Sequence, residues 1–480
     1  IQSLSYTEMD TMGTSTLITR MTSDMNQVQN GVNLVLRLFL RSPFIVFGAM
    51  VMAFTIDVKS ALVFVVTIPA LSVVVFGVML ISMPLYKKVQ AGLDLVLRRT
   101  RENLSGVRVI RAFNKEESEI EGFDADNQKL TKMQMFVGRI SALMNPVTYV
   151  IINVAILVLV WTGAWQVEEG ILTQGSVVAL VNYMSQILVE LIKLANLVIT
   201  VTKAWACANR IENVFEQKSS MEYTRRPVQE EKGDDVITFE NVGLTYKNAG
   251  AESLSDLSFS VRRGQTVGII GGTGSGKTSL VNLIPRFYDA TRGRVLVNGV
   301  DVREYPKDQL REKIGVVPQK AVLFGGSIAD NLRWGKEDAT REEIMEALEV
   351  SQAQEFVEKR EGGMDAIVAQ NGKNLSGGQR QRLTIARALV RKPEILILDD
   401  SASALDYATD AKLRKAIRQM DPSVTVLIVS QRAASIQYAD QIIVLDDGEA
   451  VGIGTHKELL ENCPVYQEIY YSQFPKEVQA

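Results

Sequence analysis

Histidine and cysteine, the residues that most often bind zinc or carry redox chemistry, are almost absent from this sequence. Its 480 residues contain one histidine, His456, and two cysteines, Cys207 and Cys463. The cysteines lie far apart and lack the spacing of metal ligands, which argues against both a disulfide framework and a zinc site. This pattern agrees with a reducing, cytosolic environment.

Charge of one sign does not accumulate either. The formal net charge is −3 and no run of Lys and Arg stands out, so nucleic acid is not expected as a partner. The chain begins at Ile1 without an initiator methionine or a signal-peptide pattern, and we therefore expect its natural start to lie upstream. A length of 480 residues with an apolar-leaning composition predicts two or more domains.

Long apolar segments dominate the first 212 residues. Ser60–Tyr86 and Leu143–Val167 contain no charged residue, and each is long enough to cross a hydrocarbon core of about 30 Å as a helix. Leu34–Ile56 and Ile171–Thr200 are also long enough, although each carries two charged residues. Buried helices of a large soluble protein are the alternative, but charge-free runs of this length are rare in soluble cores.

The distribution of basic residues predicts how these four spans are oriented. The stretch between Lys87 and Arg139 is rich in Lys and Arg, whereas Trp165–Ser176 holds Glu168 and Glu169 and no base. Loops rich in Lys and Arg stay in the cytosol, so the first stretch is expected inside the cell and the second outside. The sequence thus predicts a multi-pass protein of the cell membrane, with the lipid bilayer as one of its partners.

A change of composition marks the end of the predicted membrane domain, residues 1–212. Residues 213–235 are polar and charged and contain Pro227 and Gly233, as is typical of a linker. From residue 236 to residue 480, short Val- and Ile-rich runs alternate with helical patterns. This alternation predicts an α/β domain with a largely parallel sheet.

A phosphate-binding loop is predicted inside this second domain. The segment GGTGSGKT, Gly271–Thr278, follows the strand-like Thr266–Ile270 and precedes the apolar helical run Ser279–Ile284. Glycines let backbone N–H groups face a polyphosphate, and the helix N-terminus adds a favourable partial charge. We expect Lys277 to hold the β- and γ-phosphates of ATP and the hydroxyl of Thr278 to bind Mg²⁺. The nucleotide-binding residues predicted in the loop are Gly272, Thr273, Gly274, Ser275, Gly276, Lys277 and Thr278.

Two further segments carry features of the same chemistry. The apolar run Glu394–Leu398 ends in Asp399, at the place where the Mg²⁺ of a phosphate-binding-loop ATPase requires an acid, although many buried strands end in Asp. LSGGQ, Leu375–Gln379, precedes the helical run Arg380–Leu389 and provides a second helix start able to bind a phosphate. Two phosphate-binding segments in one domain need an explanation.

A family resemblance supplies one. The ordered set of Tyr246, GGTGSGKT, Gln319 in VVPQ, LSGGQ, ILILDD and SALD resembles the nucleotide-binding domain of ATP-binding-cassette transporters, and the resemblance extends through the spans to nearly the whole chain. In that family two such domains dimerise head to tail, and each ATP lies between the phosphate-binding loop of one subunit and the LSGGQ of the other. Exporters of this kind have six spans per half, which implies two further spans upstream of the four seen here.

The resemblance also implies roles for individual residues. Tyr246 would stack on adenine, for which a core aromatic residue on a strand is the alternative. The implied Mg²⁺ ligands are Thr278, Gln319 and Asp399. The residues implied to contact the ATP bound by the partner subunit, or to lie near its phosphate-binding loop, are Ser376, Gly377, Gly378, Gln379 and Asp406. Thr14–Gln29 and Phe113–Phe123 match the two cytosolic coupling regions, although solvated amphipathic helices are the alternative for both.

Two catalytic positions depart from the family pattern, and the loop before LSGGQ also departs, because Gln370 stands where the family usually has an acidic residue. Active members have Glu after the Asp of the Mg²⁺ site and a His after the next strand, whereas this chain has Asp400 and Gln431. Asp is one methylene shorter than Glu, and a misplacement of about 1 Å can cost on the order of a hundredfold in rate. The alternative is that both changes are harmless. We interpret Asp400 and Gln431 as degenerate catalytic positions, so that ATP binds here but is hydrolysed slowly.

The sequence therefore predicts an all-α transmembrane domain of the exporter type followed by an α/β nucleotide-binding domain. The predicted protein is one subunit of a heterodimeric exporter of amphipathic or drug-like small molecules, which binds ATP and Mg²⁺ and completes the hydrolytic site of a second, different half-exporter. A lipid or peptide exporter and an ATP-gated channel or regulator stay open as alternatives. A soluble ATPase of the same superfamily is excluded by the spans.

Overall fold

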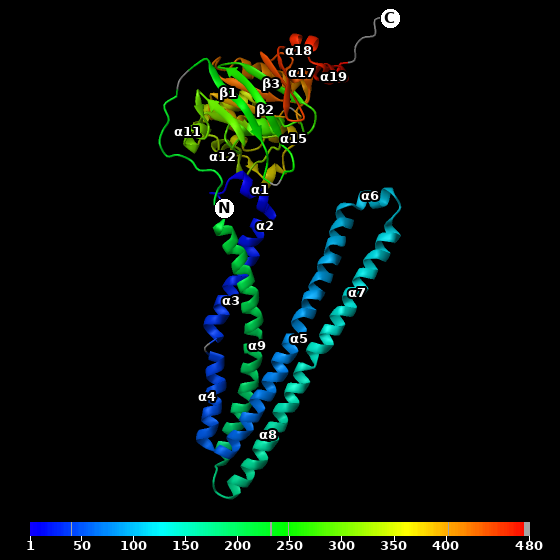
Figure 1. Ribbon diagram of the computed structural model, residues 1–480, viewed down its shortest axis with the longest axis vertical. Coiled ribbons are helices and arrows are strands. Elements are labelled where there is room, and N and C mark those ends of the chain that lie inside the picture. The colour runs from blue at the N-terminus through cyan, green and yellow to red at the C-terminus, as the bar shows by residue number, and fades with distance from the viewer. Residues whose placement is uncertain (40, 231–232, 248, 402, 475–480) are drawn as a thin grey trace. The chain divides into compact units, whose positions relative to one another are not determined.

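The computed structural model describes residues 1–39, 41–230, 233–247, 249–401 and 403–474. The chain divides into two compact units (Figure 1). One comprises residues 15–216, and the other joins residues 1–14 to residues 217–480. The predicted limits at residues 212 and 235 stay a prediction of where the domains begin and end.

The regular secondary structure described in the first unit is all helical. Its elements are α2 (Thr14–Thr19), a π-helical turn (Arg20–Asp24), α3 (Met25–Leu38), α4 (Arg41–Ile56), α5 (Val58–Ser105), α6 (Val107–Ala112), α7 (Glu116–Ala142), α8 (Met144–Glu168) and α9 (Gln174–Glu216). Helix α5 runs beside α7 and α8, and α9 runs beside α3 and α4 (Figure 1).

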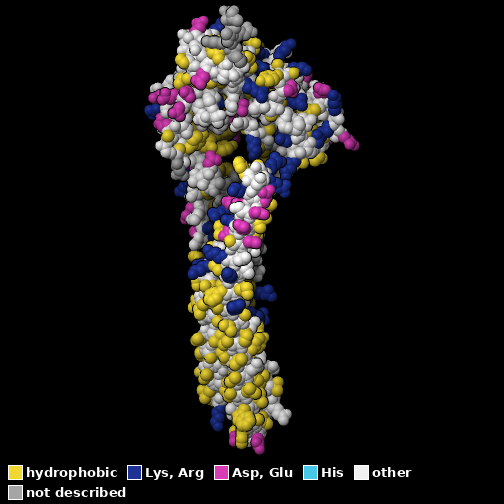
Figure 2. Space-filling model, turned by 90° about the vertical axis from the view of Figure 1, so that its right-hand side faces the viewer, with side chains coloured by type: hydrophobic (Ala, Val, Ile, Leu, Met, Phe, Trp, Pro, Cys, Tyr) yellow, Lys and Arg dark blue, Asp and Glu magenta, His cyan; other side chains and the backbone are white. Residues whose placement is uncertain are grey.

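Among the described residues, four helical stretches are long and apolar enough to cross a membrane: Thr14–Ile56, Val58–Ser105, Glu116–Glu168 and Gln174–Glu216. Three of these stretches contain a predicted span entirely, and Gln174–Glu216 contains all of the fourth, Ile171–Thr200, except its first three residues. The prediction of four apolar helices of membrane-spanning length is therefore confirmed. Hydrophobic side chains cover the helical unit along the spans (Figure 2). Buried side chains such as Phe64, Leu71 and Leu159 hold the helices together from inside.

The charged residues that interrupt the last predicted span are paired with each other. Glu190 on α9 is buried, and its carboxylate accepts a hydrogen bond from the hydroxyl of Ser42 on α4 at 2.7 Å and one from Lys193 at 2.8 Å. A carboxylate without partners in an apolar bundle would be costly. The pairing explains how this stretch remains a helix of the bundle despite its charges.

The second unit is an α/β domain. Its strands are β1 (Asp235–Leu244), β2 (Leu254–Arg262), β3 (Thr266–Gly271), β4 (Arg292–Val297), β5 (Val300–Asp301), β6 (Ile314–Val317), β7 (Gly326–Ser327), β8 (Ile367–Val368), β9 (Ile395–Asp399), β10 (Thr425–Val429), β11 (Gln441–Asp446) and β12 (Glu449–Gly454). Its helices are α1 (Tyr6–Met12), α10 (Lys277–Leu283), α11 (Lys307–Glu312), α12 (Ile328–Arg333), α13 (Arg341–Val350), α14 (Gln354–Glu358), α15 (Gly377–Leu389), α16 (Tyr407–Arg418), α17 (Ala433–Ile436), α18 (His456–Asn462) and α19 (Pro464–Gln473).

The main sheet has the order β12-β11-β3-β10-β9-β6, and only its β11–β12 pair is antiparallel. A second, antiparallel sheet has the order β2-β1-β4-β5. Alternate residues of β9 enter two different cores: Ile395 and Ile397 pack with the antiparallel sheet, while Leu396 and Leu398 pack with helices. A sheet covered on both faces needs continuous apolar strands, and the run ILIL supplies one. The α/β prediction is therefore confirmed, and the covered sheet brings the carboxyl ends of β3 and β9 together at one edge.

Candidate nucleotide site

The predicted phosphate-binding loop connects β3 to α10, as the sequence suggests. Its backbone turns sharply, with φ of 85° at Gly274 and 91° at Gly276. A side chain at Gly276 would also place its Cβ 2.8 Å from the carbonyl oxygen of Ser253. Both the positive φ and the close approach require glycine. The loop conformation therefore depends on the glycines that its sequence supplies.

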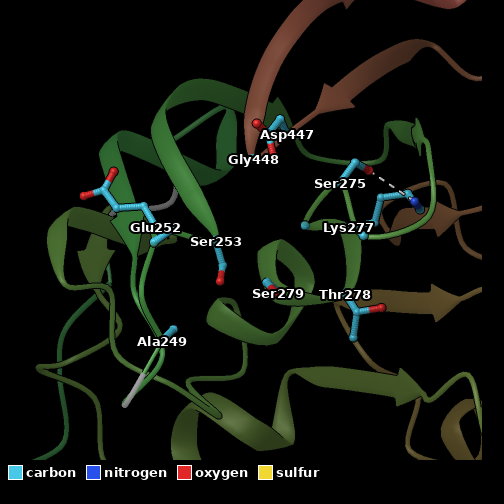
Figure 3. A pocket seen from close by; sticks show the side chains of 12 residues that line it. Ala249, Glu252, Ser253, Ser275, Lys277, Thr278, Ser279, Asp447 and Gly448 are labelled. Atoms are coloured by element: carbon cyan, nitrogen blue, oxygen red, sulfur yellow. Dashed lines mark hydrogen bonds between the residues drawn. The ribbon is translucent and has the colours of Figure 1, made fainter.

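Lys277, the first residue of α10, turns back into this loop (Figure 3). Its ammonium group donates hydrogen bonds to the carbonyl oxygens of Gly271, at 2.9 Å, and Gly272, and to the hydroxyl of Ser275 at 3.2 Å. Burial lowers the pKa of Lys277, while Asp400 and Asp399 act in the opposite direction. A buried cation is thus held at the phosphate-binding loop, as the binding of a polyphosphate requires.

Thr278 and Asp399 meet at the edge formed by β3 and β9. The Thr278 hydroxyl donates to the Asp399 carboxylate at 3.0 Å, and only 5% of Asp399 is exposed. Burial raises the pKa of Asp399, whereas the hydrogen bond from Thr278 opposes the rise. A nearby cation would offset the cost of this buried charge.

The oxygens of Thr278 and Asp399 fit Mg²⁺, which prefers oxygen ligands and usually takes only one or two carboxylates from the protein, with water and substrate phosphates completing its shell. In the described ranges, no cluster of three or more His, Cys, Asp or Glu residues could hold a metal ion. A site built with few protein ligands suits Mg²⁺ bound together with a nucleotide and does not suit an ion held by protein alone.

The two degenerate positions lie close to this edge. Asp400 has a φ of 45°, its backbone N–H donates to the carbonyl of Val429 at 3.0 Å, and its carboxylate accepts a hydrogen bond from the Gln319 amide at 3.5 Å. Burial raises the pKa of Asp400. Gln431 follows β10, is exposed, and its backbone carbonyl accepts a hydrogen bond from Gln473 at 2.8 Å. The histidine of the sequence, His456, lies on α18 and pairs with the hydroxyl of Tyr466 at 2.8 Å, so no imidazole stands at position 431.

Tyr246 lies next to the same helix. Its hydroxyl donates to Ser279 of α10 at 2.9 Å, and its ring meets that of Tyr288 edge to face at 5.0 Å. Burial raises the pKa of Tyr246. The structure therefore brings Tyr246, Lys277, Thr278, Gln319, Asp399 and Asp400 to one region of the domain.

A cavity of about 440 Å³ lies beside the loop (Figure 3). Besides the loop residues from Gly274 onward, Ser253, Asp447 and Gly448 line it. The sequence analysis did not select these three. The dipeptide Asp447–Gly448 is the turn of the β11–β12 hairpin, with φ of 43° and 85°, and Asp-Gly is a recognisable hairpin signal. That signal predicts the turn but not its place beside the loop.

The LSGGQ segment and Asp406 lie at helix N-termini outside the cavity beside the phosphate-binding loop. Ser376 caps α15, where its hydroxyl accepts a hydrogen bond from the Gln379 N–H at 3.2 Å, and Asp406 caps α16 through the Thr409 N–H at 2.9 Å. Neither residue lines the cavity beside the phosphate-binding loop. Within the described part of the chain, no hydrogen bond joins residues 375–379 to residues 271–278. One chain thus presents the two predicted phosphate-binding segments as separate surfaces.

Together, the parallel sheet, the loop after β3 and the acid at the end of β9 define a phosphate-binding-loop ATPase domain joined to a helical membrane unit. Residues 1–191 match the family described as ABC transporter transmembrane region, and residues 254–403 match the family described as ABC transporter. An uncharacterized ABC transporter ATP-binding protein of Mycobacterium tuberculosis is 38% identical over 476 residues, which cover 98% of this chain and 81% of that protein. The chain belongs to the ATP-binding-cassette transporter family.

Other relatives have a lower sequence identity to this chain or match a shorter part of it. An ATP-dependent lipid A-core flippase of Vibrio vulnificus is 31% identical over 98% of this chain and 80% of that protein. A probable multidrug resistance transporter of Bacillus subtilis, YheI, is 35% identical over 78% of this chain and 64% of that protein. The solved structure of a bacterial Atm1-family ABC exporter with ATP bound has a TM-score of 0.78, 24% identity, and covers 98% of this chain and 83% of that chain. The chain is thus a half-transporter with the exporter fold, and its ATPase activity is coupled to transport.

Proposed function

We propose that this chain is the degenerate-site subunit of a heterodimeric exporter of amphipathic or drug-like compounds. It binds ATP and Mg²⁺ at its own loop, hydrolyses that ATP slowly, and completes a faster site on a different partner subunit. In this proposal Lys277 binds the phosphates, Thr278, Asp399 and Gln319 bind Mg²⁺, and Tyr246 stacks on the adenine.

One observation carries the proposal: the groups suited to binding are present, but those suited to activating water are changed. Lys277 and Asp399 are buried and hydrogen-bonded within the site. At the next position Asp400 stands in place of Glu, and Gln431 stands in place of His. A shorter carboxylate and an amide in place of an imidazole both weaken general-base chemistry. Two changes in the same step support a slow site.

The second phosphate-binding segment supports the role toward a partner. Ser376 and the helix start at Gly377 are exposed or partly exposed, and they lie outside the cavity next to this chain's own loop. Ser376, Gly377, Gly378 and Gln379 would therefore contact the nucleotide of the partner subunit, and Asp406 would lie near its phosphate-binding loop.

The cargo is proposed on similarity. The relative named as a probable multidrug resistance transporter favours drug-like compounds. The relatives named as lipid A-core flippases favour a lipid as the second candidate. Uptake of a fluorescent drug and of a fluorescent lipid into inverted vesicles separates the two, and ATP-dependent accumulation of either would exclude a simple channel.

The asymmetry is tested by steady-state ATP hydrolysis of the assembled transporter. Replacing the partner's catalytic Glu by Gln should lower the rate by about 10² to 10⁴, the usual contribution of a positioned acid–base group. Asp400→Asn in this chain should change the rate by less than about threefold, since its site contributes little turnover. Equal losses in the two variants, or a fully active homodimer of this chain, would reject the proposal.

A further inference from the structure

Helix α1 lies in the same compact unit as the nucleotide site, and no role has been assigned to it so far. Its N-terminus is closed by a capping box between Ser5 and Glu8. The buried Glu8 carboxylate also accepts a hydrogen bond from the backbone N–H of Ser220 at 3.3 Å. Helix α1 is therefore anchored to the segment that follows α9.

Two side chains of α1 reach the segment that follows α10. The ring of Tyr6 lies 4.9 Å from that of Phe287 and 6.0 Å from that of Tyr288. The Asp10 carboxylate accepts a hydrogen bond from the Tyr288 hydroxyl at 2.6 Å. Hydrogen bonds to an ionised carboxylate are short and strong, so the orientation of the Tyr288 ring depends on α1.

Tyr288 in turn supports Tyr246. The two rings meet edge to face, with an interplanar angle of 89°. This geometry is directional, because the positive edge of one ring points at the negative face of the other. On its other side, Tyr246 is fixed by its hydrogen bond to Ser279, which lines the cavity beside the phosphate-binding loop. An unbroken series of contacts thus joins Asp10 to the nucleotide site through two tyrosines.

We propose that Tyr288 is a positioning residue for Tyr246 and that Asp10 couples it to α1, so that α1 responds to the base of bound ATP. The proposal rests on the proposed function only in taking Tyr246 as the ring that stacks on adenine. Coupling between two sites is reciprocal. ATP should therefore order α1, and loss of the Tyr288 ring should weaken the binding of the base without weakening that of the phosphates.

The first test is amide hydrogen exchange of α1 in the full chain purified in detergent. Mg²⁺-ATP is compared with Mg²⁺-tripolyphosphate, which carries phosphates and no base. ATP should slow exchange in residues 9–13 by about threefold or more, whereas saturating tripolyphosphate should leave it within about twofold. In Tyr288→Phe, which keeps the ring and removes the hydroxyl, saturating ATP should no longer slow α1. Equal protection by both ligands, or full protection in Tyr288→Phe, would overturn the proposal.

The second test compares affinities. Tyr288→Leu removes the edge-to-face partner and should weaken ATP binding by about twofold to tenfold, while tripolyphosphate binding stays unchanged. A merely structural role would weaken both. Tyr438→Leu, at an exposed ring stacked under Arg418, is the matched control and should change neither affinity.

Tyr246→Ala separates this inference from the proposed function. If Tyr246→Ala leaves ATP affinity unchanged, Tyr246 does not bind the base, and both the assignment of Tyr246 and this inference are wrong. If Tyr246→Ala weakens ATP binding but Tyr288→Leu does not, only the positioning role of Tyr288 is wrong.

Discussion

Lys277→Met offers a direct test of the nucleotide site, because it removes the charge while keeping a long apolar side chain. Lys277 is 8% exposed, and its ammonium group makes hydrogen bonds to two loop carbonyls and to Ser275. Met cannot donate any of them. The variant therefore separates the contribution of the ammonium group from that of the side-chain stem.

Two effects have to be weighed. Without nucleotide, the loss of three hydrogen bonds at about 1 kcal/mol each is partly offset, because a buried cation is also removed. We expect a net loss of stability of about 1–2 kcal/mol, which leaves the domain folded. With nucleotide, at least one charge-assisted contact to phosphate is lost, and such contacts contribute about 1.5–3 kcal/mol. ATP affinity should therefore fall by about 10-fold to 150-fold.

The assay is equilibrium binding of ATP to the purified chain, with thermal unfolding measured on the same samples. Lys457→Met on α18, where the lysine is exposed, is the control and should bind ATP as the wild type does. Lys277→Arg keeps the charge but puts a wider group into a buried position, so its ATP affinity should also lie well below that of the wild type. An ATP affinity within twofold of the wild type in a folded Lys277→Met variant would refute the assignment of this loop.

Three further predictions concern the same domain. The double variant Asp400→Glu, Gln431→His should raise single-turnover hydrolysis at this chain's own site by about 10-fold to 100-fold, measured with the partner's catalytic Glu removed; no gain would mean that the substitutions are not what slows the site. Burial raises the pKa of Asp399 in the folded chain above its value in the unfolded chain, so the folded chain binds this proton more strongly. The resulting stabilisation is fully present below the unfolded-state pKa and is lost as pH rises through the folded-state pKa. Asp399→Asn should therefore raise the melting temperature of the nucleotide-free chain at pH 7 while abolishing Mg²⁺-dependent ATP binding, and a lower melting temperature would contradict the electrostatic argument. Ser376→Ala should impair hydrolysis at the partner's site while ATP affinity at this chain's loop stays unchanged, and full turnover would argue against the head-to-tail arrangement.

The spans and the phosphate-binding loop could be predicted because each depends on local sequence. Charge-free runs of membrane length have few other stable solutions. Gly274 and Gly276 have positive φ, which favours glycine. The local sequence pattern is therefore enough to predict the turn. Flanking strand and helix signals then place the loop between β3 and α10.

Other parts of the site depend on contacts between distant segments. Asp447 and Gly448 reach the cavity because β11 pairs with β3, and no local pattern specifies that pairing. Similarly, the sequence did not predict the contacts of Tyr6 and Asp10 with Phe287 and Tyr288, which lie far away in the chain. A seven-residue helix carries too little periodicity to show which surface it will meet.

The contacts of the site also bear on why binding and hydrolysis can change independently. Lys277 and Asp399 are buried, and their hydrogen bonds of 2.9 and 3.0 Å tie them to the loop and to its threonine. Asp400 is only half-buried, and its side chain meets Gln319 at 3.5 Å, while the side chain of Gln431 is exposed. Of the first pair, substitution of Lys277 would leave the loop carbonyls that accept its hydrogen bonds without a partner and so destabilise the domain itself. Substitutions at Asp400 and Gln431 leave few polar groups without a hydrogen-bond partner. Catalytic groups can therefore be lost at these two positions while the fold and the nucleotide affinity persist.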